Sequence, residues 1–118
     1  MTREWGMRIR FISKEQLLEM MENGDDFVLV DARRTEDFEK GHIPSAKSLP
    51  AGRVGAAHED ILGDKTRTVV TYCGDFQCHA STNAAKELMR LGYGDVRDYK
   101  GGRKDWDAAG LPIVTGKQ

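Results

Sequence analysis

Cys73 stands at the end of the strand-like run from Thr68 to Tyr72, and a helix-like pattern opens shortly afterwards at Ser81. A thiol between a buried strand and a helix start lies near backbone amides that have no intrahelical partner. Such amides bind anions and hold a neighbouring cysteine as thiolate at neutral pH. The segment therefore indicates a nucleophile that handles anionic substrates, with a buried structural cysteine as the alternative.

Strand-like and helix-like segments alternate along the chain. We expect strands at residues 9–12, 27–30, 46–49, 68–72 and 95–99. We expect helices after Ser13, which forms a capping box with Gln16, then at 35–40 with Thr35 as its cap, irregularly within 51–63, at 81–91 and at 104–109. This alternation predicts an α/β fold: a central, mainly parallel sheet of about five strands with helices on both faces. Ligands bind at the carboxyl ends of such strands, where Asp31 and Cys73 both fall.

Size and composition narrow the function further. The 118 residues are expected to form a single domain, 1–118, and the net charge of -1 argues against nucleic acid or a membrane surface as partner. Two cysteines cannot build a disulfide framework. Residues 1–6 carry charges where a signal peptide needs an apolar run, and no apolar stretch approaches the ~20 residues of a membrane span. The expected compartment is the reducing cytoplasm.

Two ordered blocks of residues then make the chain recognisable. The first block is LVDAR at 29–33, Glu36, Phe38 and GHIPSA at 41–46. The second is VVTYC at 69–73, AAKEL at 84–88, LGY at 91–93, Val96, GG at 101–102, Trp106 and GLP at 110–112. In this order, over about residues 27–114, they resemble the rhodanese-like domain family.

The resemblance implies a sulfurtransferase in a small α/β domain. Cys73 would attack a sulfane sulfur, become a persulfide, and pass that sulfur to a thiophilic acceptor such as a thiol. The partners are then a small sulfur-containing donor and a thiol acceptor, a partner protein included, with no cofactor and no metal. The substrate-binding cradle would be the main-chain N–H groups of Gly74, Asp75, Phe76, Gln77, Cys78, His79, Ala80 and Ser81.

Four further residues are expected to support the site. Asp31 would hydrogen-bond a neighbouring loop, and Arg33 would pair with Glu36 or flank the pocket. His42, in the GHI segment, would form a structural hydrogen bond. Arg103 follows the glycine pair at 101–102, which would allow a close backbone approach beside the pocket.

The loop itself departs from the family pattern. Residues 73–80 read CGDFQCHA, about two residues longer than the common form, with an aspartate and without the usual arginine. A longer loop with a second cysteine resembles one subgroup of the family. Without an arginine fork, bidentate recognition of an oxyanion is lost, so thiosulfate is a doubtful donor. Basic side chains would have to reach in from elsewhere, and the candidates are Arg33, Arg34, Arg53, Arg103 and Lys104.

Cys78, His79 and Asp75 each have more than one interpretation. Cys78 could attack a Cys73 persulfide and leave a disulfide, protect Cys73 as a resolving thiol, or fill space, and we favour the filler. His79 could lower the pKa of the thiol or simply face solvent. Asp75 is expected to point outward and cap a turn. A zinc site at Cys73, Cys78 and His79 lacks a fourth ligand, so no metal is predicted.

Two other classes of function compete with sulfur transfer. The missing loop arginine is compatible with a catalytically weak module that binds a partner or senses redox state. Oxyanion chemistry of the phosphatase or arsenate-reductase type depends on a loop arginine, which is absent here. We therefore predict a sulfurtransferase with Cys73 as its nucleophile.

Overall fold

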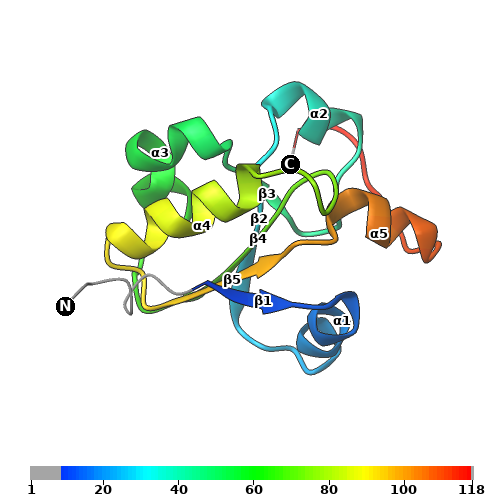
Figure 1. Cartoon of the computed structure of the whole chain (residues 1–118), viewed down its shortest axis with the longest axis horizontal. Helices are drawn as coiled ribbons and strands as arrows, with labels where there is room; N and C mark the ends of the chain where they lie inside the picture. The colour runs from blue at the N-terminus through cyan, green and yellow to red at the C-terminus, as the bar shows by residue number, and fades with distance from the viewer. Residues whose placement is uncertain (1–8, 118) are drawn as a thin grey trace.

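Five parallel strands form one sheet in the order β1-β5-β4-β2-β3 (Figure 1). The computed structural model describes residues 9–117. Its strands are β1 (Arg10–Ile12), β2 (Phe27–Asp31), β3 (Lys47–Ser48), β4 (Thr68–Tyr72) and β5 (Asp95–Tyr99). Its helices are α1 (Lys14–Glu22), α2 (Thr35–Lys40), the 3-10 turn η2 (Ala51–Arg53), α3 (Val54–Ile61), α4 (Ala80–Arg90) and α5 (Gly102–Ala108). The predicted α/β class with a parallel sheet is confirmed.

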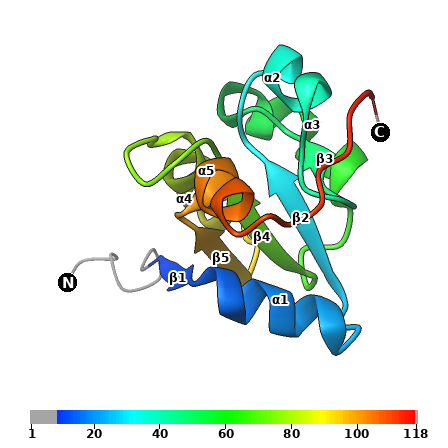
Figure 2. The ribbon, with the colours of Figure 1, turned by 90° about the vertical axis from the view of Figure 1, so that its right-hand side faces the viewer.

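Helices cover both faces of the sheet, and the strand residues alternate between the two cores (Figure 2). Val28 of β2 packs in the core beneath α3 and α4, which also holds Leu88. Its neighbour Leu29 points to the opposite core, formed with Leu17 of α1 and Trp106 of α5. Because successive side chains of a strand point to opposite faces, a strand covered on both sides is apolar throughout.

Most helix boundaries follow their sequence signals, with two corrections. The capping box is confirmed: Ser13 Oγ accepts the Gln16 amide at 3.1 Å, and Gln16 Oε1 accepts the Ser13 amide at 2.8 Å. Thr35 is not the cap of α2 but its first residue, and the capping position belongs to Arg34, which makes no side-chain cap bond. Helix α5 begins at Gly102 rather than at 104, because carbonyl groups of a neighbouring loop accept its first amides.

The C-terminal ends of the three central strands lie level with one another. Asp31 pairs with Tyr72, and Tyr72 pairs with Tyr99 across the sheet. The residues that follow these strands therefore meet at one edge, and Cys73 follows the middle strand of the three. This is the edge at which the sequence places the site.

The sequence analysis also expects neither a signal peptide nor a membrane-spanning segment. Residues 1–6, whose charges argue against a signal peptide, lie outside the described residues. Among residues 9–117, no helix has the length and apolar character needed to cross a bilayer.

Candidate active site in the β4–α4 loop

Cys73 is buried at the end of β4, with 1% of its surface exposed, and it forms a disulfide bond with Cys78. Their Cα atoms are 6.4 Å apart, within the usual range for a disulfide. The favoured interpretation of Cys78 as a filler is wrong, because its sulfur is bonded to Cys73. The structure accordingly presents the oxidised cysteine pair rather than the expected free thiolate.

Asp75 folds the loop so that the two cysteines meet. Its Oδ1 accepts the amides of Gln77 and Cys78 at 3.0 and 3.1 Å, and its carbonyl oxygen also accepts the Cys78 amide. The prediction that Asp75 caps a turn is confirmed. The predicted cradle needs a correction, since the Gln77 and Cys78 amides donate to this carboxylate and are not free to bind an anion.

Lys100, directly after β5, and the first turn of α5 hold the loop at both ends. The amides of Arg103 and Lys104 donate to the carbonyl oxygens of Cys73 and Gly74, at 2.9 and 2.8 Å. At the other end, Lys100 Nζ donates to the carbonyl oxygen of Cys78. The sequence analysis missed Lys100. Its position directly after β5, at the same sheet edge as Cys73, was a signal that could have identified it.

Gly102 provides the close backbone approach that the glycine pair predicts. Its φ is +66°, and a Cβ on it would overlap the carbonyl oxygen of Cys73. Only glycine meets both requirements without strain. The start of α5 can therefore lie directly against the cysteine-bearing loop.

Helix α4 begins where the loop ends, and its first turn is fixed to the sheet. The buried Thr71 hydroxyl donates to the Ser81 carbonyl oxygen at 3.1 Å, and the Thr82 hydroxyl donates to buried Asp98 at 2.7 Å. Ser81 is 1% exposed, and its own hydroxyl has no hydrogen-bond partner among the described residues. The positive end of the α4 dipole is thus held beside the cysteine pair.

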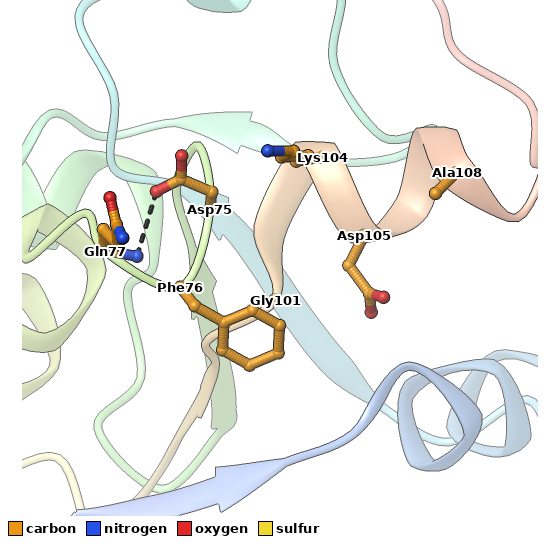
Figure 3. Close-up of a pocket in the computed structure, with 7 residues that line it drawn as sticks. All are labelled: Asp75, Phe76, Gln77, Gly101, Lys104, Asp105 and Ala108. Atoms are coloured by element: carbon orange, nitrogen blue, oxygen red, sulfur yellow. Dashed lines mark hydrogen bonds between the residues drawn. The ribbon is translucent and has the colours of Figure 1, made fainter.

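A pocket of about 370 Å³ opens on one side of the loop tip (Figure 3). Phe76, the tip residue, is 66% exposed and lies at this pocket. Lys104, on α5, brings a positive charge to the pocket, and it is one of the basic side chains that the sequence analysis expected to reach in from elsewhere. Its full lining is Asp75, Phe76, Gln77, Gly101, Lys104, Asp105 and Ala108.

A second pocket of about 370 Å³ lies on the Cys78 side. It is lined by Ala32, Arg33, Arg34, Asp37, Pro50, Ala51, Gly52, Cys78 and Ala80. Arg33 and Arg34 therefore also reach the site from the loop after β2, whereas Arg53 is exposed on η2 and lines neither pocket. Cys78 is partly exposed here, so it is the outward sulfur of the pair.

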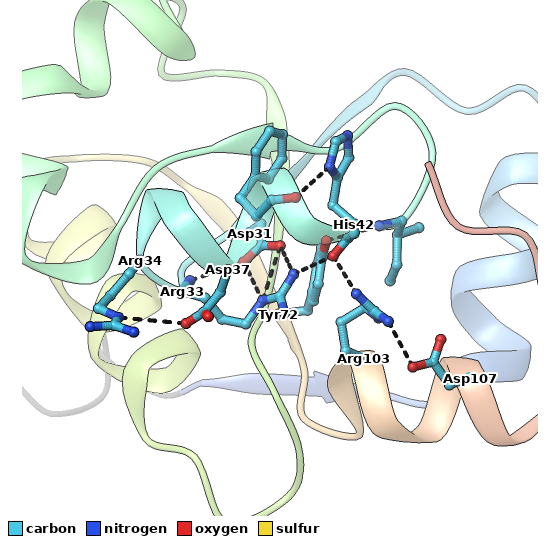
Figure 4. A network of polar contacts seen from close by, with 11 residues as sticks. Asp31, Arg33, Arg34, Asp37, His42, Tyr72, Arg103 and Asp107 are labelled. Carbon is cyan, nitrogen blue, oxygen red and sulfur yellow. Dashed lines mark hydrogen bonds and ion pairs between the residues drawn. The ribbon is translucent and has the colours of Figure 1, made fainter. Parts of the chain in front are cut away.

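Buried Asp31 and partly buried Arg33 form an ion pair at this second pocket, which Arg33 also lines; Figure 4 shows the pair. Arg33 Nη2 lies 2.7 Å from Asp31 Oδ2, and the same nitrogen donates to the Gly41 carbonyl oxygen at 2.8 Å. Burial alone would lower the pKa of Arg33, but the hydrogen bonds and the charge of Asp31 outweigh it, so this pKa is raised above its usual value. Of the two expectations for Arg33, pairing with Glu36 is wrong, because its guanidinium is bonded to fully buried Asp31, which needs that charge. The alternative, a position flanking the pocket, agrees with the structure.

Tyr72 adds a hydroxyl that the sequence analysis missed. It accepts the Ile43 amide at 3.0 Å and is fully buried. Burial first, and then the charge of Asp31, raise the pKa of Tyr72 well above its usual range. The tyrosine therefore stays neutral and ties β4 to the segment around His42. The position of Tyr72 directly before Cys73 was the sequence signal that could have identified it.

His42 and Arg103 make contacts that stabilise the segments around the site, and their side chains do not bond to the sulfurs. His42 is fully buried, stacks on Phe38 at 3.7 Å between ring centroids, and has Nδ1 at 2.8 Å from the Phe38 carbonyl oxygen. This agrees with the predicted structural hydrogen bond. The Arg103 side chain donates to the carbonyl oxygen of Gly41 and, at 2.8 Å, to Asp107 (Figure 4). It lines neither pocket.

His79 occupies the N-terminal capping position of α4 and is exposed, in line with a solvent-facing role. Its side chain makes no cap hydrogen bond. Within residues 9–117, no group of three or more His, Cys, Asp or Glu side chains is placed to hold a metal ion.

Comparison with known proteins identifies the family. The family model described as rhodanese-like domain matches residues 13–109, and these include the sheet edge and the cysteine loop. The chain belongs to the rhodanese-like domain family.

Individual relatives extend this result. The chain is 36% identical over 104 residues to a protein of Allochromatium vinosum named "Sulfurtransferase", with 88% of this chain and 94% of that protein covered. It is 31% identical over 105 residues to the HTH-type transcriptional regulator Rv0324 of Mycobacterium tuberculosis. That match covers 89% of this chain but 45% of the regulator, so the chain spans under half of that relative.

Solved structures share the fold. The BH2092 protein of Bacillus halodurans superposes with a TM-score of 0.82 at 25% identity, over 90% of this chain and 77% of that one. A rhodanese with anions from E. coli gives a TM-score of 0.63 at 29% identity, over 75% and 98% of the two chains.

Proposed function

We propose that this protein is a sulfurtransferase that carries sulfane sulfur as a persulfide on Cys73 and passes it to a thiol acceptor. One observation carries the proposal. Cys73 follows the middle strand at the sheet's C-terminal edge, in a loop that leads into the N-terminus of α4. Membership of the rhodanese-like family and the similarity to a protein named sulfurtransferase support it.

The chemistry begins once the Cys73–Cys78 disulfide has been reduced. The Cys73 thiolate attacks the sulfane sulfur of a donor, the donor's bond to that sulfur breaks, and the leaving group departs with the electron pair. The sulfur stays on Cys73 as a persulfide. An acceptor thiolate then attacks the terminal sulfur, and Cys73 leaves as a thiolate, ready for another cycle.

The start of α4 supplies the electrostatic support for these anions. Its dipole places positive charge beside the loop, which favours the thiolate over the thiol and stabilises the terminal sulfur of the persulfide. The buried Ser81 hydroxyl, in the first turn of α4, is a further donor in this region. These groups do the work that an arginine would do in a loop of the common form.

The preferred donor follows from the loop's own charge. The Asp75 carboxylate occupies two amides and repels anions, which disfavours the dianion thiosulfate. The exposed Phe76 ring offers contact to an organic group. We therefore propose a persulfide or thiosulfonate as the donor. The proposed acceptor is a small thiol or a protein cysteine. The proposed compartment is the reducing cytoplasm, without nucleic acid or membrane as partner.

The test compares the reduced wild type with Cys73→Ser and Cys78→Ser. Each protein is exposed to glutathione persulfide, to a thiosulfonate and to thiosulfate, and its intact mass is then measured. Cys78→Ser is expected to gain about 32 Da, one sulfur atom, at Cys73, and to gain it more slowly from thiosulfate. Full sulfur-transfer activity in Cys73→Ser would refute the proposal.

A further inference from the structure

The loop brings its second cysteine to the first through contacts that do not depend on the disulfide. The Asp75 carboxylate accepts the Cys78 amide at 3.1 Å, and Lys100, directly after β5, donates to the Cys78 carbonyl oxygen. At the start of α5, the Arg103 amide donates to the Cys73 carbonyl oxygen at 2.9 Å. Because both residues are anchored, their sulfurs remain neighbours after reduction, and one is positioned to react on the other.

From this arrangement we infer that Cys78 is a second catalytic residue, which expels sulfide from the Cys73 persulfide and leaves a Cys73–Cys78 disulfide. The inference rests on the proposed function, because it requires a persulfide on Cys73. It adds a second activity to sulfur transfer: the reduction of sulfane sulfur to sulfide, at the expense of a thiol.

The step balances within the loop. The Cys78 thiolate attacks the inner sulfur of the persulfide, which is Cys73 Sγ, and the bond between that atom and the terminal sulfur breaks. The terminal sulfur leaves with the electron pair as hydrosulfide. It has gained two electrons, and the two cysteines have lost two by forming their bond. The cycle resets when two equivalents of an external thiol, or one dithiol, reduce the disulfide.

The two sulfurs differ in their access to that reductant. Cys73 is 1% exposed, whereas Cys78 is partly exposed and lines the pocket that also contains Arg34 and Gly52. An external thiolate therefore attacks Cys78 and forms a mixed disulfide there. Cys73 is the leaving group and is released as a thiolate beside the start of α4, which is the form that accepts the next sulfur.

A single-turnover experiment tests the inference. Wild type and Cys78→Ser are reduced, freed of reductant under anaerobic conditions, and mixed with glutathione persulfide or a thiosulfonate. We expect the wild type to release one sulfide per chain and end about 2 Da lighter than its reduced form. Cys78→Ser should keep the added sulfur and release sulfide at least about tenfold more slowly.

The outcomes separate the two proposals. If the wild type keeps the added sulfur as long as Cys78→Ser does, the inference fails while the proposed function stands. If Cys78→Ser takes up no sulfur at Cys73 from any of the donors, the proposed function fails and the inference fails with it.

A trapping experiment tests the order of attack on the disulfide. The oxidised wild type is mixed with glutathione in the presence of an alkylating agent, and the loop peptide is sequenced by tandem mass spectrometry. Glutathione is expected on Cys78 and the alkyl group on Cys73. The reverse assignment would overturn the role given to Cys78 as the outward sulfur.

Discussion

Gly102 lies so close to the main chain of Cys73 that a side chain on the glycine would overlap the cysteine's carbonyl oxygen. The same glycine has a φ of +66°, a backbone conformation that other residues adopt with strain. The contact therefore couples the start of α5 to the cysteine loop.

Replacement of Gly102 by alanine should separate these two segments. We expect Gly102→Ala to lower the free energy of unfolding by about 2 kcal/mol or more, because backbone strain and steric overlap add. Gly110→Ala is the matched control: its φ is +72°, but a Cβ there meets nothing within 4 Å, so only the strain of about 1 kcal/mol remains. Chemical denaturation measures both, and equal losses would contradict the coupling.

Removal of the Asp31 charge should leave Arg33 without its buried partner. We expect Asp31→Asn to destabilise the fold by about 3 kcal/mol, measured by denaturation at neutral pH. Asp37→Asn is the control, since it breaks only the exposed pair with Arg34, whose side chain is 77% exposed. That loss should stay below about 1 kcal/mol. A similar loss in the two variants would show that burial of the Asp31–Arg33 pair is energetically unimportant.

Asp95 should make stability depend on acid pH. Partial burial alone would raise the pKa of Asp95, but hydrogen bonds from Arg97 and Thr68 outweigh it, and the pKa lies below the ordinary 3.8. A carboxyl with a depressed pKa contributes stability above its unfolded-state pKa and loses it as the pH falls through the folded-state value. Asp95→Asn should therefore cost about 1 kcal/mol at pH 7, and the difference from wild type should vanish as the pH falls below 3.8.

The control for this titration is Asp26→Asn. Asp26 is 85% exposed in its contact with Arg67, so its removal should change stability little at any pH. Denaturation curves collected from pH 7 down to acid measure both variants. An Asp95→Asn difference that persisted unchanged into acid would show that the ionised carboxylate is not the source of the stability.

Neutralisation of Asp75 should improve the use of thiosulfate. Asp75→Asn keeps an oxygen that can accept the Gln77 and Cys78 amides but removes the negative charge. We expect the rate of Cys73 labelling by thiosulfate to rise about threefold, and the rise to shrink at high salt. An uncharged organic trisulfide is the control donor, and its rate should not change. Equal acceleration of both donors would point to altered loop mobility instead of charge.

The sequence predicts the sheet well because its signals are local. The run at 27–30 is apolar throughout, and the run at 68–72 is rich in apolar and β-branched residues. A strand covered on both faces needs such a pattern whatever its partners are. The capping box at Ser13 and Gln16 is equally local. These features place Cys73 and Asp31 at the same sheet edge before any coordinates are considered.

The contacts that define the site are less predictable because they join distant segments. Lys100, directly after β5, donates to the Cys78 carbonyl oxygen, and the residues next to Lys100 in the sequence give no sign of that bond. Arg33 forms its ion pair with Asp31 and not with Glu36 because Asp31 is fully buried, and burial depends on the whole fold. The disulfide depends on the turn that Asp75 makes, since four intervening residues permit several loop shapes and only some bring Cys78 back to Cys73.

The two pockets beside the loop have no lining residue in common. One surrounds Phe76 and Lys104, and the other surrounds Cys78, Arg34 and Gly52. Side chains that line one pocket without holding the loop can therefore be exchanged while the other pocket keeps its lining. Asp75 is not one of them, because its carboxylate holds the Cys78 amide. A library directed at Phe76 and Ala108 would vary one flank alone, and a second library at Arg34 and Gly52 would vary the other.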